Sequence, residues 1–267
     1  MSRILVGCDP EIFVKREGQF VSAHGLIEGN KQEPKRVPRG AVQVDGMALE
    51  FNINPAATEQ QFVGNVKAVM QTLANMVPGY ELAPVPVAHF SKEYIESQPP
   101  VARELGCEPD FNAYTGGVNL KPDAERPMRT ASGHVHIGWT KDQDIFSQDH
   151  IEACHAAVKQ CDIVLGLASL FYDSDTERRS MYGKAGCLRY KPYGVEYRTL
   201  SNAWLLSEER MAWVFRNTKR AMEMLFAGKA LFQDAEQKGV DIQAIINNSD
   251  KDQAESLIRQ FGLEMVK

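Results

Sequence analysis

Apolar and polar residues alternate along several short segments, and this pattern predicts β-strands. The clearest segments are residues 4–14, 42–53, 133–139 and 194–200. Successive side chains of a strand point to opposite faces of the sheet, so each segment can bury one face and keep the other polar. Asp45-Gly46 is a strong turn dipeptide and divides the second segment into two short strands.

Other segments carry apolar residues at helical spacing. We expect helices over residues 58–76, with Thr58 as the N-terminal cap, over residues 149–170 and over residues 207–226. The last of these begins a series of three or four helices that reaches the end of the chain. Strands followed by helices are typical of an α+β fold with an antiparallel sheet. We expect a curved sheet with a polar concave face and helices packed on its other side.

Three polar segments predict loops. Residues 31–40 are basic and rich in proline, residues 99–127 contain several prolines and glycines, and residues 176–190 are rich in arginine and glycine. A long loop inside a compact domain usually serves a binding site. We therefore expect the first two loops to contact substrates and the third to be a flexible cationic loop.

Composition limits the classes of function. With 267 residues, of which 43% are hydrophobic, the chain can bury a large core, and we expect a single domain over residues 1–267 with a helical part over 205–267. A formal net charge of -5 argues against general nucleic-acid binding, which needs a basic excess. The 5 cysteines include no C-x-x-C pair, as in reduced cytosolic proteins, and no apolar run is long enough to cross a membrane.

Four pairs of polar residues flank a single spacer and suggest one polar sheet face: Asp9 and Glu11, Glu50 and Asn52, His134 and His136, Glu196 and Arg198. Carboxylates with few imidazoles favour Mg²⁺ or Mn²⁺ over zinc. The candidate ligands are Asp9, Glu11, Glu50, His134 and Glu196. Each pair alone also fits a solvated sheet face or a surface ion pair. Together, however, carboxylates that share one face repel each other unless cations lie between them.

Basic residues of the second half could bind polyphosphate, because guanidinium groups contact phosphate oxygens in pairs. The candidates are Arg179, Lys184, Arg189 and Arg198, with Arg129 upstream, whereas Arg178 is better interpreted as part of a solvated loop. The chain has no Walker-type loop, no Gly-x-Ser-x-Gly segment and no cysteine that the sequence marks as a nucleophile. Nucleotide binding would therefore depend on metal ions, arginines and strand residues.

The polar motifs resemble those of glutamine synthetases. Ser132-Gly133-His134-Val135-His136 is similar to their Gly-x-His-x-His strand, and Val195-Glu196-Tyr197-Arg198 to their Glu-x-Arg strand. Asp9-Pro10-Glu11 resembles the acidic pair of their first active-site strand, and Glu50 an acid of the next, whose usual companion is either Gln43 or Asp45 here. In their detail the motifs most resemble the phage-type COOH-NH2 ligases, which are compact glutamine-synthetase-like amidoligases.

This resemblance implies a glutamine-synthetase-like catalytic domain that uses ATP and Mg²⁺ or Mn²⁺. Glu11 and Glu50 would hold one ion, and Asp9, His134 and Glu196 another. His136 would lie beside the nucleotide, Arg198 would contact the transferred phosphoryl group, and Arg189 would stabilise the phosphates. Glu196, Arg189 and Arg198 would thus be the catalytic residues, and Arg179 and Lys184 would help to bind ATP.

The implied reaction joins a carboxylate to an amine, both from small molecules or peptides, through an acyl phosphate. Protein nucleophiles are not needed, since phosphoryl transfer depends on alignment and charge neutralisation. Two alternatives remain open, namely a guanidino or carboxyl kinase of the same fold and a binding protein without catalytic activity. The resemblance implies a cytoplasmic protein, in the host cytoplasm if a phage encodes it, and is compatible with a homo-oligomer.

Overall fold

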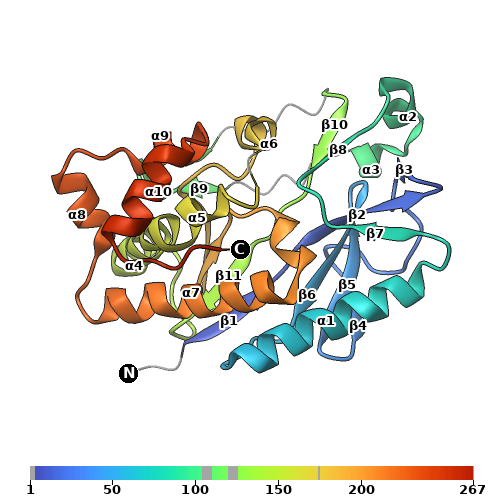
Figure 1. Ribbon diagram of the computed structural model, residues 1–267. Helices are drawn as coiled ribbons and strands as arrows, with labels where there is room; N and C mark the ends of the chain where they lie inside the picture. The colour runs from blue at the N-terminus through green and yellow to red at the C-terminus, as the bar shows by residue number, and fades with distance from the viewer. Residues whose placement is uncertain (1–3, 104–109, 120–125, 174, 267) are drawn as a thin grey trace.

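Antiparallel strands and helices build the fold of the computed structural model, which describes residues 4–103, 110–119, 126–173 and 175–266 (Figure 1). The predicted α+β class is confirmed. The strands are β1 (Leu5–Cys8), β2 (Glu11–Arg16), β3 (Gln19–Val21), β4 (Lys35–Val37), β5 (Gly40–Asp45), β6 (Ala48–Ile53), β7 (Glu81–Ala83), β8 (Val87–His89), β9 (Phe111–Asn112), β10 (Met128–Thr130), β11 (Val135–Gly138), β12 (Cys187–Lys191) and β13 (Gly194–Tyr197).

The helices lie mostly in the second half of the chain. They are α1 (Glu59–Met76), α2 (Lys92–Ser97), α3 (Pro100–Arg103), α4 (Gln148–Cys161), α5 (Leu167–Ser169), α6 (Thr176–Met181), α7 (Glu208–Phe226), α8 (Leu231–Gln237), α9 (Ile242–Asn247) and α10 (Lys251–Gln260). A π-helix (Asp162–Gly166) joins α4 to α5, and a 3₁₀-helix (Asn202–Leu206) precedes α7. Among the described residues, no helix has the length and apolar character needed to cross a membrane.

Two sheets contain most of the strands. A five-stranded sheet has the order β1-β11-β13-β12-β9, and a six-stranded sheet has the order β3-β2-β6-β5-β4 with β7 also paired to β2. Strands β8 and β10 form a separate pair. All of these pairings are antiparallel. The single polar face expected from the sequence is therefore distributed over two sheets.

The two sheets meet where the chain passes from β1 to β2. We expected one strand over residues 4–14, but the chain leaves the first sheet at Asp9-Pro10, and proline cannot donate a backbone hydrogen bond there. The backbone NH groups of Asp9 and Glu11 still bond to the carbonyls of His134 (3.3 Å) and Ser132 (2.9 Å). Both acids are thereby held beside the segment that contains the two histidines.

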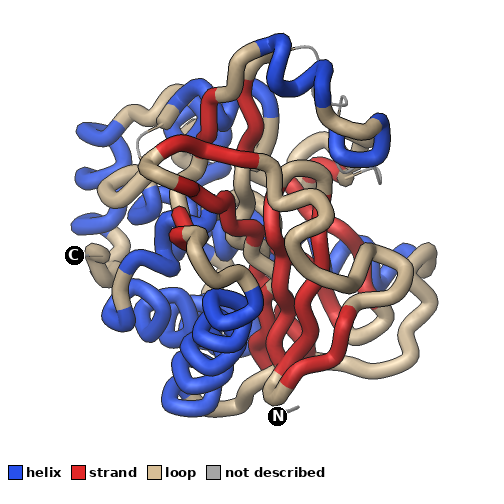
Figure 2. Tube along the Cα trace, turned by 90° about the vertical axis from the view of Figure 1, so that its right-hand side faces the viewer, coloured by secondary structure: helices blue, strands red, loops and turns tan. Residues whose placement is uncertain are grey.

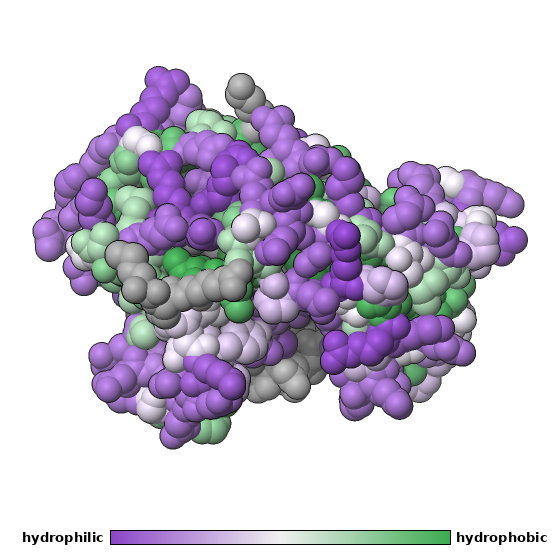
Figure 3. Space-filling model, turned by 90° about the horizontal axis from the view of Figure 1, so that it is seen from below, coloured by the Kyte–Doolittle hydropathy of each residue, from purple (hydrophilic) through white to green (hydrophobic). Residues whose placement is uncertain are grey.

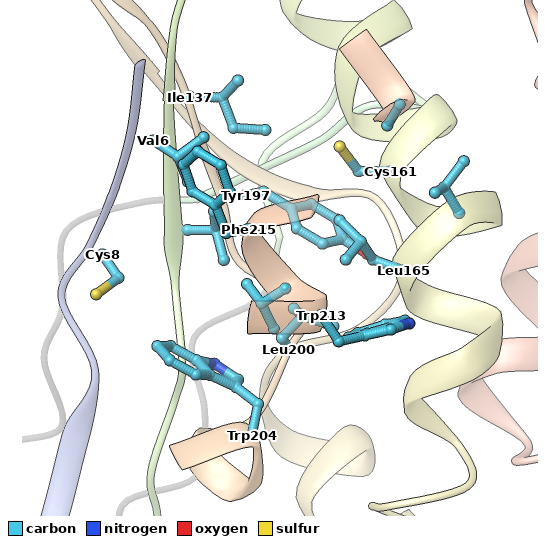
Figure 4. Packing of buried hydrophobic residues seen from close by; sticks show 14 of the residues in the cluster. Val6, Cys8, Ile137, Cys161, Leu165, Tyr197, Leu200, Trp204, Trp213 and Phe215 are labelled. Atoms are coloured by element: carbon cyan, nitrogen blue, oxygen red, sulfur yellow. The ribbon is translucent and has the colours of Figure 1, made fainter. Parts of the chain in front are cut away.

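Helices cover one face of the five-stranded sheet. Figure 2 shows most of the helices gathered on one side of the strands, and α4 contacts β12, β13 and α7. Apolar side chains from the strands, such as Ile137 of β11 and Tyr197 of β13, are buried in the same hydrophobic core as Leu165 of the π-helix (Figure 4). Because side chains alternate along a strand, His136 and Glu196 point to the opposite face.

The helices predicted from local signals are confirmed. Thr58 caps α1, since its hydroxyl accepts a hydrogen bond from the backbone NH of Gln61, and Ser207 caps α7 in the same way. The segment predicted at 149–170 corresponds to α4, the π-helix and α5. Four helices, α7 to α10, complete the chain as expected.

All three predicted loops contain regular structure. The described part of residues 99–127 includes α3 and β9. Residues 31–40 include β4, which pairs with β5. Residues 176–190 include helix α6, capped by the side chain of Asp175, and most of β12. Arg178 and Arg179 are buried at 0% and 1% exposure, so the solvated loop expected there is wrong. Arg178 donates to the carbonyls of Thr199 and Leu200, which satisfies its charge inside the protein.

Candidate functional site

Three predicted site residues converge at the junction of the sheets. One potential ligand atom from each of Asp9, His136 and Glu196 lies within 4.8 Å of the other two. His136 stands directly opposite Glu196 in the pairing of β11 with β13, and also opposite Gly7 in β1. Asp9 follows the end of β1, so its carboxylate reaches the same face. Two neighbouring strands, β11 and β13, and the residue after β1 thus supply the three side chains.

The same three residues have buried polar atoms without a well-formed hydrogen bond. Asp9 Oδ1, His136 Nε2 and Glu196 Oε2 are buried, and none has a partner of acceptable hydrogen-bond geometry. Buried polar atoms of this kind are rare unless an ion or water satisfies them. Two carboxylates and one imidazole fit Mg²⁺ or Mn²⁺ by the chemistry of the donor atoms. The residues present therefore fit a divalent ion.

Tyr193 orients His136. Its hydroxyl is in close contact with His136 Nδ1. Burial raises the pKa of Tyr193, so its phenol is neutral. Burial alone would lower the pKa of His136, but the charge of Asp9 raises it, so without an ion Nε2 carries a proton toward Asp9 Oδ1 at 3.0 Å. An ion that replaces this proton would be bound by the Nε2 lone pair, while the proton on Nδ1 forms a hydrogen bond to Tyr193. Metal-binding histidines are commonly held through their second nitrogen in this way.

His134 belongs to the same group and also contacts Arg198. Its Nδ1 atom is 3.5 Å from Asp9 Oδ1, 3.4 Å from Glu196 Oε1 and 3.3 Å from Arg198 Nη1. The resemblance implied that His134 binds the ion and His136 lies beside the nucleotide. In the structure both histidines contact Asp9, and His136 is the one whose free nitrogen converges with the two carboxylates. Burial, reinforced by Arg198, holds the pKa of His134 well below its usual value, so its imidazole is neutral.

Asp9 is ionised in this environment. Burial alone would raise its pKa, but the charge of His136 and the close approach of both imidazoles hold it well below the usual range. The pKa of Glu196 shifts in the opposite direction, because burial and the charge of Asp9 raise it. A divalent ion between the two carboxylates would favour the charged form of both.

Cationic side chains surround Glu196. Arg198 is in close contact with its Oε1 atom, Arg189 Nη1 lies 3.6 Å from the same oxygen, and Lys191 Nζ lies 2.9 Å from Oε2. Arg189 stands opposite Glu196 in the pairing of β12 with β13. Arg189 and Arg198 therefore lie together, as the polyphosphate hypothesis requires. The charge of the fully buried Glu196 is thus balanced by Arg198 and Lys191, with Arg189 slightly farther away.

Three residues of this group, Lys191, Asp110 and Tyr182, were not predicted from the sequence as site residues. Lys191 repeats the alternation of Arg189 along β12, a signal that could have identified it, although Lys191 lies directly after the predicted loop of residues 176–190. Asp110 places its Oδ2 atom 3.6 Å from Arg198 Nε, and the ring of Tyr182 lies 5.4 Å from the Arg198 guanidinium. Neither of these two belongs to a recognisable pattern in the sequence. Tertiary contacts alone place them.

Glu11 and Glu50 form a second acidic cluster in the adjacent sheet. They stand opposite each other in β2 and β6, and Gln43 of β5 stands opposite Glu50 on its other side. Gln43 donates a 2.6 Å hydrogen bond to Glu50, while Glu11 accepts one of 2.8 Å from the backbone NH of Ser132. Burial and the charge of Asp45 raise the pKa of Glu11 to about 7. Burial and the charge of Asp9 raise that of Glu50, so the two acidic groups interact.

Two of the candidate phosphate-binding residues, Arg179 and Arg129, donate hydrogen bonds within the protein, whereas the role of Lys184 stays a prediction. Arg179 donates hydrogen bonds to the backbone carbonyl of Asp173 (3.2 Å) and to the hydroxyl of Ser169 (3.4 Å), with a side chain that is 0% exposed. Helix α6 directs it into the core, which corrects its assignment to the cationic loop. Lys184 is exposed, and among the described residues its side chain has no ion pair with Glu196. Arg129 is buried and donates to backbone carbonyls.

None of the described thiols suits nucleophilic catalysis. Cys8, Cys154, Cys161 and Cys187 are all buried, and burial raises the pKa of each. The thiolate is the reactive form of cysteine, so these thiols stay protonated near neutral pH. Cys107 lies outside the described residues.

A groove between α1 and α7 lies apart from this site. It is lined by Glu59, Gln60, Val63, Gly64, Lys67, Glu208 and Ala212. Figure 3 views the molecule from below, the side on which α1 and α7 lie in Figure 1, and this face is mostly hydrophilic with scattered hydrophobic areas. The groove includes none of the convergent polar residues.

Comparison with known proteins adds no identification. No protein family model matches this chain, and no curated protein matches it by sequence.

Proposed function

We propose that this protein is an ATP- and Mg²⁺- or Mn²⁺-dependent carboxylate–amine ligase. The observation that carries the proposal is the convergence of Asp9, His136 and Glu196 within a ring of cationic side chains. The resemblance of the motifs to glutamine-synthetase-like amidoligases supports the same chemistry. The α+β architecture with antiparallel sheets is compatible with it.

The charges of the site fit a metal–polyphosphate complex. Asp9, His136 and Glu196 would hold the divalent ion, with His134 close enough to take part. The ion would neutralise negative charge on the phosphates. Glu196 forms ion pairs with Arg189, Lys191 and Arg198. When ATP binds, these three cations would contact phosphate oxygens in place of Glu196. Charge-assisted contacts of this type are the strongest hydrogen bonds that a protein offers to phosphate.

The residues of the chain would act by binding and orienting the reactants. Arg198 would contact the γ-phosphoryl group while a substrate carboxylate attacks it, which breaks the bond to ADP and forms an acyl phosphate. An amine would then attack the acyl carbon, lose a proton and expel phosphate. The net reaction joins carboxylate and amine and converts ATP to ADP and phosphate. Pre-organised cations are the main catalytic requirement of phosphoryl transfer.

The first experiment measures ATP binding by calorimetry with Mg²⁺ and with a chelator. We expect binding only with the ion, and its loss in Glu196→Gln. Glu59→Gln is the matched control, because Glu59 of α1 pairs with the exposed Arg216 of α7, at the groove that lies apart from the site. Undiminished ATP binding in the presence of chelator would contradict the proposal.

A second experiment identifies the reaction. The protein is incubated with ATP, Mg²⁺ and a cell extract, and new amides are sought by mass spectrometry. Phosphate release that depends on an added amine supports a ligase. Accumulation of a phosphorylated acceptor without an amide would instead indicate a kinase, and absence of Mg²⁺-dependent ATP binding would indicate a binding protein without this activity.

A further inference from the structure

Lys31 places a positive charge at the second acidic cluster. Its Nζ atom is 2.8 Å from Asp45 Oδ2, and the Asp45 side chain is only 14% exposed. Lys35, four positions along the chain, has an ion pair of the same length with Glu28, which is 84% exposed. The two lysines thus differ in the burial of their partners. Of these two lysines, Lys31 is the one that neutralises a largely buried acid, Asp45, beside Glu11 and Glu50.

The acids near Lys31 need such a charge. Burial and the charge of Asp45 raise the pKa of Glu11, and burial together with the charges of Asp9, Asp45 and Glu11 raises the pKa of Glu50. Although burial alone would lower the pKa of Lys31, its attraction to Asp45, and then to Glu50 and Glu11, raises it. Carboxylates this close are stable together only with a cation among them or with protons bound.

In the neighbouring strand β5, the residue next to Glu50 is the amide Gln43 and not an acid. Gln43 faces Glu50 directly and donates a hydrogen bond to its Oε2 atom. One lone pair of Glu50 is therefore used within the protein. Ser132 uses one oxygen of Glu11 in the same manner. These contacts distinguish this cluster from Asp9, His136 and Glu196, where Asp9 Oδ1 and His136 Nε2 face each other at 3.0 Å and Glu196 Oε2 faces the ammonium group of Lys191 at 2.9 Å.

We propose that the ammonium group of Lys31 is the permanent cation of the Glu11, Asp45 and Glu50 cluster, so that the protein binds one divalent ion instead of two. The single ion belongs at Asp9, His136 and Glu196. The proposal rests on the proposed function only for the position of that ion. It departs from the two-ion arrangement implied by the resemblance.

The test counts bound Mn²⁺ ions by equilibrium dialysis combined with electron paramagnetic resonance of free Mn²⁺. We expect one ion on the natural protein and two on Lys31→Met and Lys31→Gln. Lys31→Arg keeps the charge and should bind one. Lys35→Met is the matched control and should also bind one. Circular dichroism and thermal unfolding establish that each variant is folded, which the 44% exposure of the Lys31 side chain favours.

Each outcome decides the proposal. An unchanged ion count in both neutral variants of Lys31, or two ions on the natural protein, would overturn it. Adding Glu196→Gln to Lys31→Met separates the sites, because one ion should remain in the double variant. If the natural protein binds no ion and Lys31→Met binds one, the role of Lys31 is supported while the proposed function loses its metal site.

Discussion

The imidazole of His136 lies 3.0 Å from the carboxylate of Asp9, measured from Nε2 to Oδ1. Asp9 reaches this position because the chain turns from one sheet into the other immediately after it. His136 reaches it because it stands opposite Glu196 in the sheet. The contact therefore depends on the junction of the sheets as well as on the alternation of side chains along one strand.

This contact predicts that His136 matters more for metal affinity than His134. Substitution His136→Ala should weaken Mn²⁺ binding by at least about tenfold, since even residues that only orient a ligand typically contribute that much. His134→Ala should have a smaller effect on the ion, because Arg198 already lies 3.3 Å from its Nδ1. Calorimetric titration with Mn²⁺ measures both. Equal or reversed losses would favour His134 as the ligand, as the resemblance implied.

Lys191 should link the metal to the nucleotide. In Lys191→Met, Glu196 loses a cation 2.9 Å from its carboxylate, so Mn²⁺ should bind more tightly without nucleotide. ATP should bind about tenfold more weakly, because a charge-assisted contact to phosphate contributes on the order of 1.5 kcal/mol or more. Both affinities can be measured by calorimetry. Lys184→Met is the control and should change neither, and a comparable loss of ATP affinity there would restore Lys184 to the site.

Local signals predicted the parts of this protein that depend on short stretches of sequence. The cap Thr58, the turn at Asp45-Gly46 and the helical spacing of apolar residues act within a few positions. The pairs around His134 and Glu196 were recognisable because strand alternation places each pair on one face. Those elements and that face follow from the pattern of the sequence.

Long-range packing decided the features that the sequence did not indicate. Pro10 separates β1 from β2, but only the pairing with β11 and β6 shows that they enter different sheets. Asp110 joins the site from a segment with no strand pattern of its own. Arg179 resembles a phosphate-binding arginine in sequence, yet Asp173 holds it in the core. In each example the deciding partner is distant or belongs to an unpatterned loop.

Arg179 should therefore support stability and not nucleotide binding. Arg179→Met leaves the buried carboxylate of Asp173, which is 1% exposed, without its guanidinium 3.8 Å away. Breaking one side of a buried ion pair typically costs about 3–5 kcal/mol. Urea unfolding should show a loss of this size, while the folded fraction keeps its affinity for ATP. A stable variant with weakened ATP binding would contradict this assignment and support the one made from sequence.

Asp162 should make the stability of the protein depend on pH. It is fully buried in the π-helix, where it accepts hydrogen bonds from Tyr197 (2.8 Å) and Thr199 (3.0 Å) on either side of Arg198. Burial raises its pKa from 3.8 to about 7 despite these hydrogen bonds. The pKa is thus higher in the folded state than in the unfolded state, so between these values the folded state binds more protons.

The protonated carboxyl group of Asp162 therefore makes its full contribution to the free energy of unfolding below about pH 4. This contribution is lost as the pH rises through 7, because the buried carboxyl group must then ionise. A shift of this size corresponds to roughly 4 kcal/mol, at about 1.4 kcal/mol for each pKa unit. Urea unfolding of the natural protein and of Asp162→Asn at pH 5 and pH 8 isolates the contribution, because Glu11 and other acids titrate in both proteins. The natural protein should lose more stability between these two pH values than the variant, in which position 162 carries no charge. If both proteins show the same dependence on pH, Asp162 is already ionised at pH 5 and the hydrogen bonds from Tyr197 and Thr199 outweigh its burial.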